Sequence, residues 1–201
     1  MPKPVSQPCL RNQTPIYQSL KQYFNKPGSV LELACGTAQH AVYLAERLPH
    51  LNWQTSDLEP ALEGARLWIN EATLKNLKPP MMLNVEDEDW GDQVYDYCYS
   101  ANLVHFISMQ SVHSMFAGIS KHIKKQGLLA LYGPYNQNGF TSEGNARLDE
   151  WLKADVNPDA GIKELNEIVS LAIDKGLQLK ANHDMPANNH LLIFTKSGNT
   201  G

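Results

Sequence analysis

The segment from Ser29 to His40, SVLELACGTAQH, constrains the fold of this chain more than any other stretch. It opens with a short apolar run that is typical of a buried strand, and it continues into a turn of small residues around Gly36. The apolar residues after the turn recur at the spacing of a helix, at Ala41, Leu44, Ala45 and Leu48. A strand, a tight turn and a helix N-terminus in this order predict a ligand site at the carboxyl edge of a parallel sheet.

Strand and helix patterns alternate along most of the chain, which favours right-handed crossovers within one mostly parallel sheet. The expected strands of this part lie at 29–34, 51–56, 81–85, 94–100 and 128–132. Two last strands are expected at 177–182 and 190–196, and the short segment between them cannot hold a helical crossover, so this pair is expected to be antiparallel. We therefore predict an α/β fold, a single Rossmann-like domain over residues 1–201 with helices on both faces of the sheet.

Two other segments have a distinct composition. The proline-rich residues 1–13 are expected to form a loose leader before a helix that begins at Thr14 and Pro15. The polar, glycine-rich segment 133–144 is long for a loop of a compact domain, which makes it a candidate lid or binding loop.

Charge and composition narrow the class of protein. The chain carries a net charge of −4, and its densest basic cluster, residues 121–125, falls where a helix is expected to end and complements the helix dipole. We therefore expect no long nucleic acid as partner, and no apolar run approaches the ~20 residues that cross a membrane. The three cysteines form no CxxC pair and the seven histidines no HExxH spacing, so no metal site is expected. These features are typical of a cytoplasmic protein, and they leave its oligomeric state open.

Asp57 stands 21 residues after Gly36, at the expected end of the second strand. A carboxylate there can accept hydrogen bonds from both hydroxyls of a ribose, or it can cap the next helix. The dinucleotide pattern G-x-G-x-x-G fits poorly, because one register puts Gln39 at the third glycine and the other puts Ala38 where the pyrophosphate should lie. A phosphate-free nucleoside cofactor with a cationic sulfonium, S-adenosylmethionine, suits this acidic turn better.

The segment LELACGTA resembles the first motif, E/D-x-G-x-G-x-G, of the class I S-adenosylmethionine-dependent methyltransferases. Glu32 stands at the acid, and Ala34, Gly36 and Ala38 stand at the three glycines. More closely, the chain resembles the uncharacterised methyltransferase-like protein 26 family. That similarity lies in RNQTPI, GTAQHAVYLAERLPHLNWQTSD, LLALYGPY, TSEGNARLDEWL and MPANNHLLIF.

The resemblance implies a seven-stranded sheet with the last strand antiparallel and S-adenosylmethionine as cofactor. It implies that residues 32–38 line the methionine part and that Asp57 holds the ribose. Leu58 would flank the adenine, and Asn84 and Val85 would approach its amino edge. Two departures, Ala38 for a third glycine and Asn84 for the frequent Asp, predict weaker binding of the cofactor without its loss.

Further candidates follow from position along the chain. Gln39 and His40 open the first crossover helix and are expected to face the methionine part of the cofactor, or to cap the helix. Ser100 ends the fourth expected strand and is a candidate cofactor contact.

The catalytic candidates lie after the fourth and fifth strands. Methyl transfer needs an aligned acceptor and exclusion of water, and an acidic acceptor benefits from a general base. His105 is the candidate base, or a packed histidine of the apolar segment LVHFI. Asn102 orients the acceptor or caps a turn, and Tyr135 is a candidate for the acceptor wall. The segment SANL lacks the [DN]PP[YFW] signature of many amino-methylating enzymes.

These patterns predict an S-adenosylmethionine-dependent methyltransferase that acts on an unidentified small-molecule acceptor. A non-catalytic S-adenosylmethionine- or nucleoside-binding module is the alternative, and an NAD-dependent dehydrogenase is a distant third.

Overall fold

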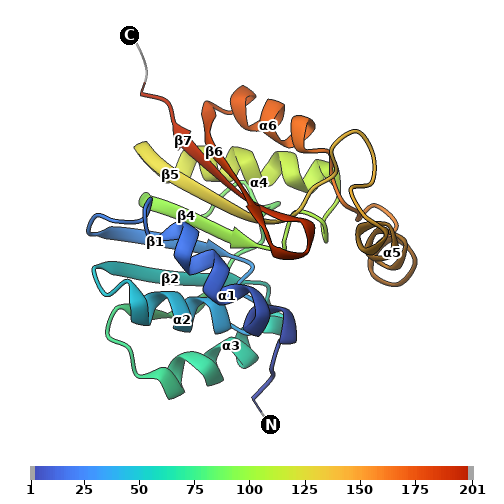
Figure 1. The fold of residues 1–201 in the computed structure, drawn as a ribbon. Coiled ribbons are helices and arrows are strands. Elements are labelled where there is room, and N and C mark those ends of the chain that lie inside the picture. Colours follow the sequence, from blue (N-terminus) through green and yellow to red (C-terminus); the bar gives the residue numbers. More distant parts are fainter. Residues whose placement is uncertain (1–2, 199–201) are drawn as a thin grey trace.

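A computed structural model describes residues 3–198 of the chain, and Figure 1 shows the order of its elements. The strands are β1 (Gly28–Leu33), β2 (Leu51–Asp57), β3 (Leu77–Met82), β4 (Tyr95–Ala101), β5 (Ile123–Pro134), β6 (Leu177–Met185) and β7 (Asn189–Lys196). The α-helices are α1 (Gln7–Leu20), α2 (Gln39–Arg47), α3 (Glu59–Ala72), α4 (Met109–His122), α5 (Glu143–Trp151) and α6 (Leu165–Asp174). A π-helical turn (Leu152–Val156) follows α5, and a 3₁₀ turn (Pro186–Asn188) joins β6 to β7.

The strands form one sheet in the order β3-β2-β1-β4-β5-β7-β6. Strands β1 to β5 pair in parallel, and β7 runs antiparallel to both β5 and β6. The predicted α/β fold, with seven strands and the last one antiparallel, is confirmed. The strand order reverses between β1 and β4, which is the place where open α/β sheets bind their ligands.

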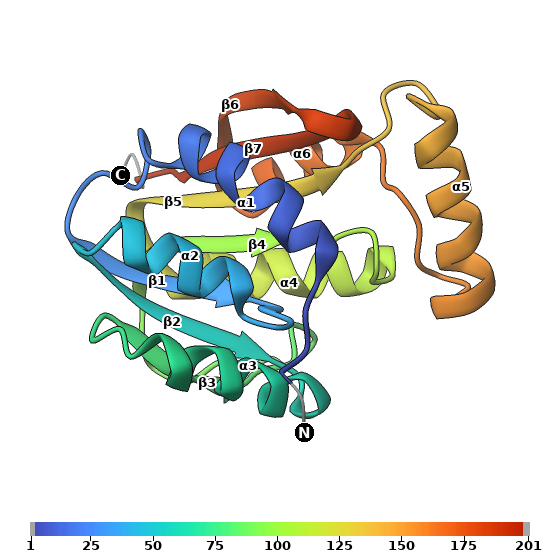
Figure 2. The same cartoon turned by 60° about the horizontal axis from the view of Figure 1, so that its bottom comes forward.

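Helices cover both faces of the sheet, as predicted (Figure 2). On one face α1, α2 and α3 pack against a cluster of side chains that includes Val30, Trp53 and Tyr99. On the other face α4 and α6 pack against a second cluster that includes Leu31 and Phe194. Helix α5 belongs to neither layer and stands beyond the carboxyl ends of the strands.

The expectation of a loose leader over residues 1–13 is wrong for residues 7–13, which form the first part of α1; residues 3–6 precede the helix without regular secondary structure, and residues 1–2 lie outside the described part. Helix α1 begins at Gln7, and the side chain of Ser6 accepts a hydrogen bond from the backbone of Cys9. Pro8 falls in the first turn, where a missing N–H costs nothing, and Pro15 lies inside the helix rather than at its start. Ser6 and Pro8 therefore mark the start of the helix locally, and the backbone N–H of Ser6, which donates to Gln39 Oε1 at 2.5 Å, ties this start to α2.

Two strands begin earlier than expected. Strand β3 covers 77–82 instead of 81–85, and it can contain Pro79 and Pro80 because it is an edge strand with a free side. Strand β5 begins at Ile123 instead of residue 128, because helix α4 already ends at His122.

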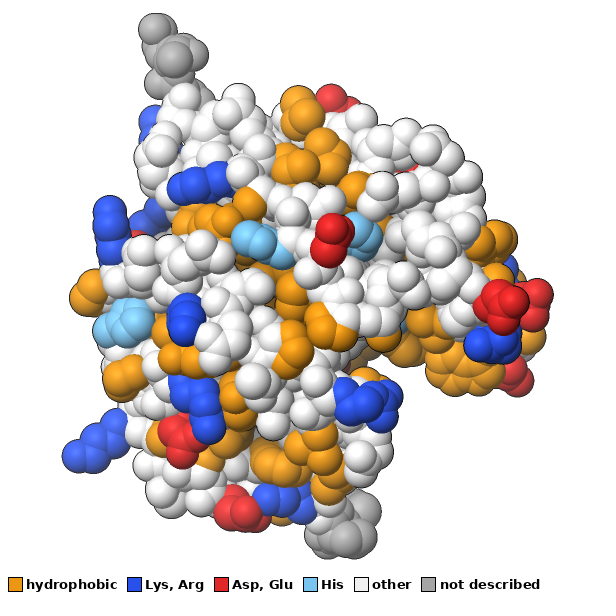
Figure 3. All heavy atoms as spheres, viewed as in Figure 1, with side chains coloured by type: hydrophobic (Ala, Val, Ile, Leu, Met, Phe, Trp, Pro, Cys, Tyr) orange, Lys and Arg blue, Asp and Glu red, His pale blue; other side chains and the backbone are white. Residues whose placement is uncertain are grey.

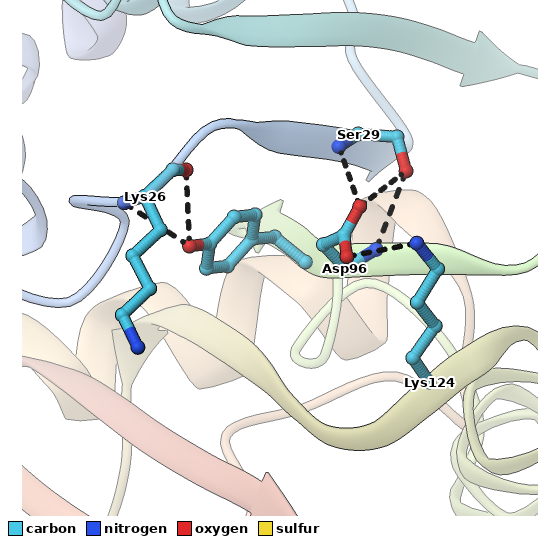
Figure 4. Close-up of polar contacts among 5 residues, drawn as sticks. Lys26, Ser29, Asp96 and Lys124 are labelled. Atoms are coloured by element: carbon cyan, nitrogen blue, oxygen red, sulfur yellow. Dashed lines mark hydrogen bonds and ion pairs between the residues drawn. The ribbon is translucent and has the colours of Figure 1, made fainter.

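The early start of β5 places Lys124 in the sheet. Its ammonium pairs with Asp96 at 2.9 Å, and Asp96 also accepts two hydrogen bonds from Ser29. This carboxylate therefore joins β1, β4 and β5 at their amino ends (Figure 4).

Candidate functional site

A cavity of about 1210 Å³ opens at the carboxyl edge of the sheet. Its lining comes from the start of α1, the turn after β1, the loop after β4, the end of β5, helix α5 and the turn between β6 and β7. Pockets for one small ligand usually measure roughly 300–1,000 Å³, so this cavity has room for a cofactor and an acceptor together.

The turn after β1 is built from small residues in a left-handed conformation. Ala34, Gly36 and Ala38 have φ values of 54°, 57° and 62°. The backbone N–H of Gly36 donates to the carboxylate of Asp57 at 2.6 Å, and the other carboxylate oxygen accepts from the N–H of Leu58 at 2.7 Å. The end of β2 therefore holds the turn in place. Ala34 and Gly36 line the cavity, whereas Asp57 is hydrogen-bonded to the turn and is not part of the lining.

Glu32 brings a buried carboxyl to the same wall of the cavity. Its side chain is 2% exposed and accepts a hydrogen bond from Trp53 Nε1 at 2.5 Å. Burial raises the pKa of Glu32 to about 8, against the lowering effect of the Trp53 hydrogen bond and with a smaller rise from Asp57. Burial likewise raises the pKa of Asp57 and of the Cys35 thiol.

Helices α1 and α2 meet beside this turn. Gln39 Oε1 accepts hydrogen bonds from the Ser6 backbone at 2.5 Å and from Thr37 Oγ1 at 2.9 Å, so this buried side chain joins two segments and does not line the cavity. His40 lines the cavity, and its Nε2 lies 2.6 Å from Asn12 Oδ1. Burial lowers the pKa of His40 to about 4, so the ring is neutral and Nε2–H is the donor to the amide oxygen.

The loop after β4 brings two of the predicted catalytic residues into the cavity lining, Asn102 and His105. Asn102 has a φ of 64°, and its backbone N–H donates to Tyr132 O at 2.7 Å. His105 is 4% exposed, and its Nδ1 has no hydrogen-bond partner within residues 3–198. Burial, with a smaller effect of Lys163, lowers the pKa of His105 to about 4.

The remaining predicted site residues lie outside the cavity lining. Ser100 is buried and donates its hydroxyl to Leu33 O at 3.0 Å. Leu58, 49% exposed, Asn84 and Val85 follow β2 and β3, along the same sheet edge as the turn. Tyr135 is fully buried in the cluster under α4 and α6, and burial raises the pKa of its hydroxyl.

One wall of the cavity comes from residues that the sequence interpretation did not single out, namely Leu103, Phe106, Leu148 and Trp151. The rings of Phe106 and Trp151, called here the aromatic wall, meet edge to face at a centroid distance of 6.3 Å and an angle of 87°. In Figure 3 hydrophobic side chains gather around the α5 projection, beside a hollow. The sequence does hold one signal: α5 is mostly polar around Leu148 and Trp151. This pattern suits a helix that packs over a ligand rather than over the core.

With this geometry described, the chain can be compared with known proteins. A family model with the description "Protein of unknown function (DUF938)" matches residues 3–196. The chain belongs to the DUF938 family. No helix among residues 3–198 of this DUF938 protein is long and apolar enough to cross a membrane.

Solved structures share the fold of this DUF938 protein. An O-methyltransferase family protein from Burkholderia thailandensis has a TM-score of 0.84 at 18% identity, covering 95% of this chain and 58% of its own. Human N-acetylserotonin methyltransferase in complex with SAM has a TM-score of 0.79 at 10% identity, covering 93% of this chain and 52% of its own. The PH0226 protein from Pyrococcus horikoshii OT3 has a TM-score of 0.76 at 15% identity, with 96% and 92% covered. The DUF938 chain thus spans little more than half the length of the first two proteins.

Proposed function

We propose that this protein is an S-adenosylmethionine-dependent methyltransferase with a small-molecule acceptor, and that within DUF938 it is a relative of the methyltransferase-like protein 26 group. The observation that carries the proposal is the balance of acidic and basic side chains at the cavity. Its lining includes the carboxyls of Glu32 and Glu143, and Asp57 is hydrogen-bonded to the turn, whereas Arg11 is the only Lys or Arg among the described lining residues. Such a site favours a cation over the pyrophosphate of a dinucleotide.

The cofactor would extend from the cavity along the carboxyl edge of the sheet. Leu58, Asn84 and Val85 follow the outer strands β2 and β3 and would contact the adenine, and Asp57 would hold the ribose. The turn from Glu32 to Ala38 would hold the methionine part, next to Gln39, His40 and Ser100. Glu32 is the buried group suited to a cation, because one of its oxygens is bound to Trp53 and its side chain lines the cavity.

S-adenosylmethionine, when bound, supplies a methyl group on a sulfonium that needs no further activation. The protein therefore has to place the acceptor in line and exclude water. Asn102 and His105 lie on the loop after β4, next to β1 in the sheet, and the side chain of His105 lines the cavity, where its imidazole can meet an acceptor hydroxyl. His105 is the candidate base and Asn102 the candidate group that orients the acceptor.

Calorimetric titration tests the cofactor. The protein is titrated with S-adenosylmethionine, S-adenosylhomocysteine and NAD, beside Asp57→Ala and the control Asp92→Ala, which removes an exposed carboxylate that does not line the cavity. We expect both adenosyl ligands to bind, NAD to bind more weakly, and Asp57→Ala alone to weaken binding. Preference for NAD, or no binding of the adenosyl ligands, would overturn the proposal.

Methyl transfer from labelled S-adenosylmethionine to small molecules of a cell extract then tests catalysis. A labelled product that disappears in His105→Gln, with unchanged cofactor affinity, would support the enzyme. Cofactor binding without any labelled product would favour the non-catalytic module.

A further inference from the structure

Exposed aromatic side chains are confined to one part of the molecule. Among the described residues, the large aromatic side chains that are exposed are Phe106, Phe140 and Trp151, at 38%, 58% and 47%. Phe106 and Trp151 line the cavity, and Phe140 lies in the loop that leads into α5. Apolar rings that stay in water beside a cavity mark a site for an apolar ligand.

The aromatic wall is held in place by the chain beneath it. Asp149, on the same helix as Trp151, is 3% exposed and accepts a hydrogen bond from the backbone N–H of Ile162 at 2.7 Å. The neighbouring residue, Gly161, donates its N–H to the backbone oxygen of His105 at 2.9 Å. The ring of Trp151 and the loop that carries Phe106 are thus fixed relative to each other, and the wall is available without rearrangement.

A polar group stands directly beside the aromatic wall. The ring centroids of His105 and Phe106 lie 4.7 Å apart, and His105 lines the same cavity as the aromatic wall. His105 is a weak base, since burial lowers its pKa to about 4. A weak base removes a proton efficiently only from an acidic hydroxyl, and phenols, which titrate near about 10, are far more acidic than saturated alcohols.

Resting on the proposed function, we propose that the methyl acceptor is a planar aromatic molecule with a phenolic hydroxyl, its ring against Phe106 and Trp151 and its hydroxyl on His105. In the transfer, the bond from the phenolic oxygen to the methyl carbon forms as the sulfonium carbon–sulfur bond breaks. The phenolic proton passes to the imidazole of His105, and the products are an aryl methyl ether, a neutral thioether and the imidazolium.

Three probes of similar size separate the acceptor chemistries. 2-Naphthol is aromatic and acidic at oxygen, trans-2-decalol is its saturated counterpart, and 2-naphthoic acid carries a carboxylate that Arg11 would attract. Binding is measured by saturation-transfer NMR and calorimetry with protein saturated by S-adenosylhomocysteine, and methylation is measured by mass spectrometry with S-adenosylmethionine.

The variants are chosen so that a folding defect can be recognised. Trp151→Leu keeps an apolar side chain and removes the aromatic face, and Phe106→Leu does the same for the other ring. Ile173→Ala is the matched control, because this side chain is 54% exposed on α6 and does not line the cavity. Affinity for S-adenosylhomocysteine reports whether each variant keeps the rest of the site.

We expect 2-naphthol to bind and to be methylated, and each loss of a ring to weaken its binding by about threefold to tenfold. Ile173→Ala should leave this binding unchanged. The acceptor class would be overturned if trans-2-decalol bound as tightly as 2-naphthol, or if 2-naphthoic acid were methylated faster than 2-naphthol. It would also be overturned if both ring variants kept the affinity of the natural protein for 2-naphthol, or if 2-naphthol did not bind. In all these cases intact binding of S-adenosylhomocysteine leaves the proposed function standing, whereas its absence defeats both.

Discussion

The backbone oxygen of His105 accepts a hydrogen bond from the N–H of Gly161 at 2.9 Å, which joins the loop after β4 to the segment that follows α5. Gly161 has a φ of +141°, and an added Cβ would lie 2.7 Å from Asp149 Oδ1. The same carboxylate accepts the N–H of Ile162 and pairs with Lys153 at 2.5 Å. The loop that carries His105 and Phe106 and the helix that carries Trp151 are therefore both hydrogen-bonded to the segment 161–162.

This anchor makes Asp149 a positioning residue for the acceptor half of the cavity. Asp149→Ala leaves the buried N–H of Ile162 without an acceptor, at a cost of about 1–3 kcal/mol. We expect the KM for the acceptor to rise while affinity for S-adenosylhomocysteine stays unchanged. Asp149→Asn keeps an oxygen for Ile162 and should recover most of the loss, and Glu150→Ala, an exposed neighbour on α5, is the control. A parallel loss of cofactor affinity would contradict the assignment.

Glu32 is expected to make the stability of the fold fall as the pH rises. Its pKa is raised from 4.5 to about 8 chiefly by burial, so the folded state keeps a proton that the unfolded state has lost. The contribution of this proton to the free energy of unfolding is complete below pH 4.5 and disappears as the pH passes about 8. Between these values the free energy of unfolding falls by up to roughly 1.4 kcal/mol per pH unit.

Glu32→Gln keeps an acceptor for Trp53 Nε1 and has no charge to bury, so this decrease in stability with rising pH should be absent in the variant. Urea unfolding of both proteins at several pH values between 5 and 9 measures the difference, because His40 and His105 titrate in the same way in both. Identical pH profiles would show that Glu32 does not titrate as described.

Binding of the proposed cofactor is expected to release a proton from Glu32. At pH 7 the carboxyl is mostly protonated, since its pKa is about 8, and a cation beside it lowers that pKa. Calorimetric titration with S-adenosylmethionine in two buffers of different ionisation enthalpy should show up to about one proton released. S-adenosylhomocysteine, which lacks the sulfonium charge, should release less. The prediction fails if Glu32→Gln releases as many protons as the natural protein.

Replacing Ala34 by glycine is expected to stabilise the protein. Ala34 has a φ of 54°, a left-handed conformation that costs a residue with a Cβ about 1–2 kcal/mol, whereas glycine pays only a smaller entropic penalty. We expect a gain of about 0.5–1 kcal/mol in the free energy of unfolding. Ala61→Gly, in the ordinary helix α3, should instead lose about 1 kcal/mol. A loss of stability in Ala34→Gly would mean that the turn is not strained.

Much of the fold was predictable because the signals are local. The alternation of strands and helices and the antiparallel pairing of β6 with β7 depend on residues that lie close together in the chain. The turn after β1 was predictable for the same reason. Ala34 and Ala38 stand at glycine positions of the methyltransferase motif, and both adopt the conformation that glycine usually provides.

The features that sequence interpretation missed depend on contacts between distant segments. Helix α1 is held beside α2 by contacts of Ser6 and Asn12 with Gln39 and His40, in addition to the local cap at Ser6. The aromatic wall depends on Asp149 meeting Ile162, and neither contact leaves a periodic pattern in the sequence. These contacts form only after the sheet has brought together the segments that follow the carboxyl ends of its strands.

The contacts of α1 with α2 also bear on how long a bound molecule stays. Ser6, Cys9 and Asn12 line the cavity from the first two turns of α1, and the ends of helices fray faster than their centres. A bound molecule should leave the cavity when this end of α1 opens. Its residence time would then depend on the stability of the first turns of α1 more than on its contacts in the rest of the cavity. Substitutions at Asn12 would then change the association rate as well as the dissociation rate, because the molecule enters and leaves through the same opening.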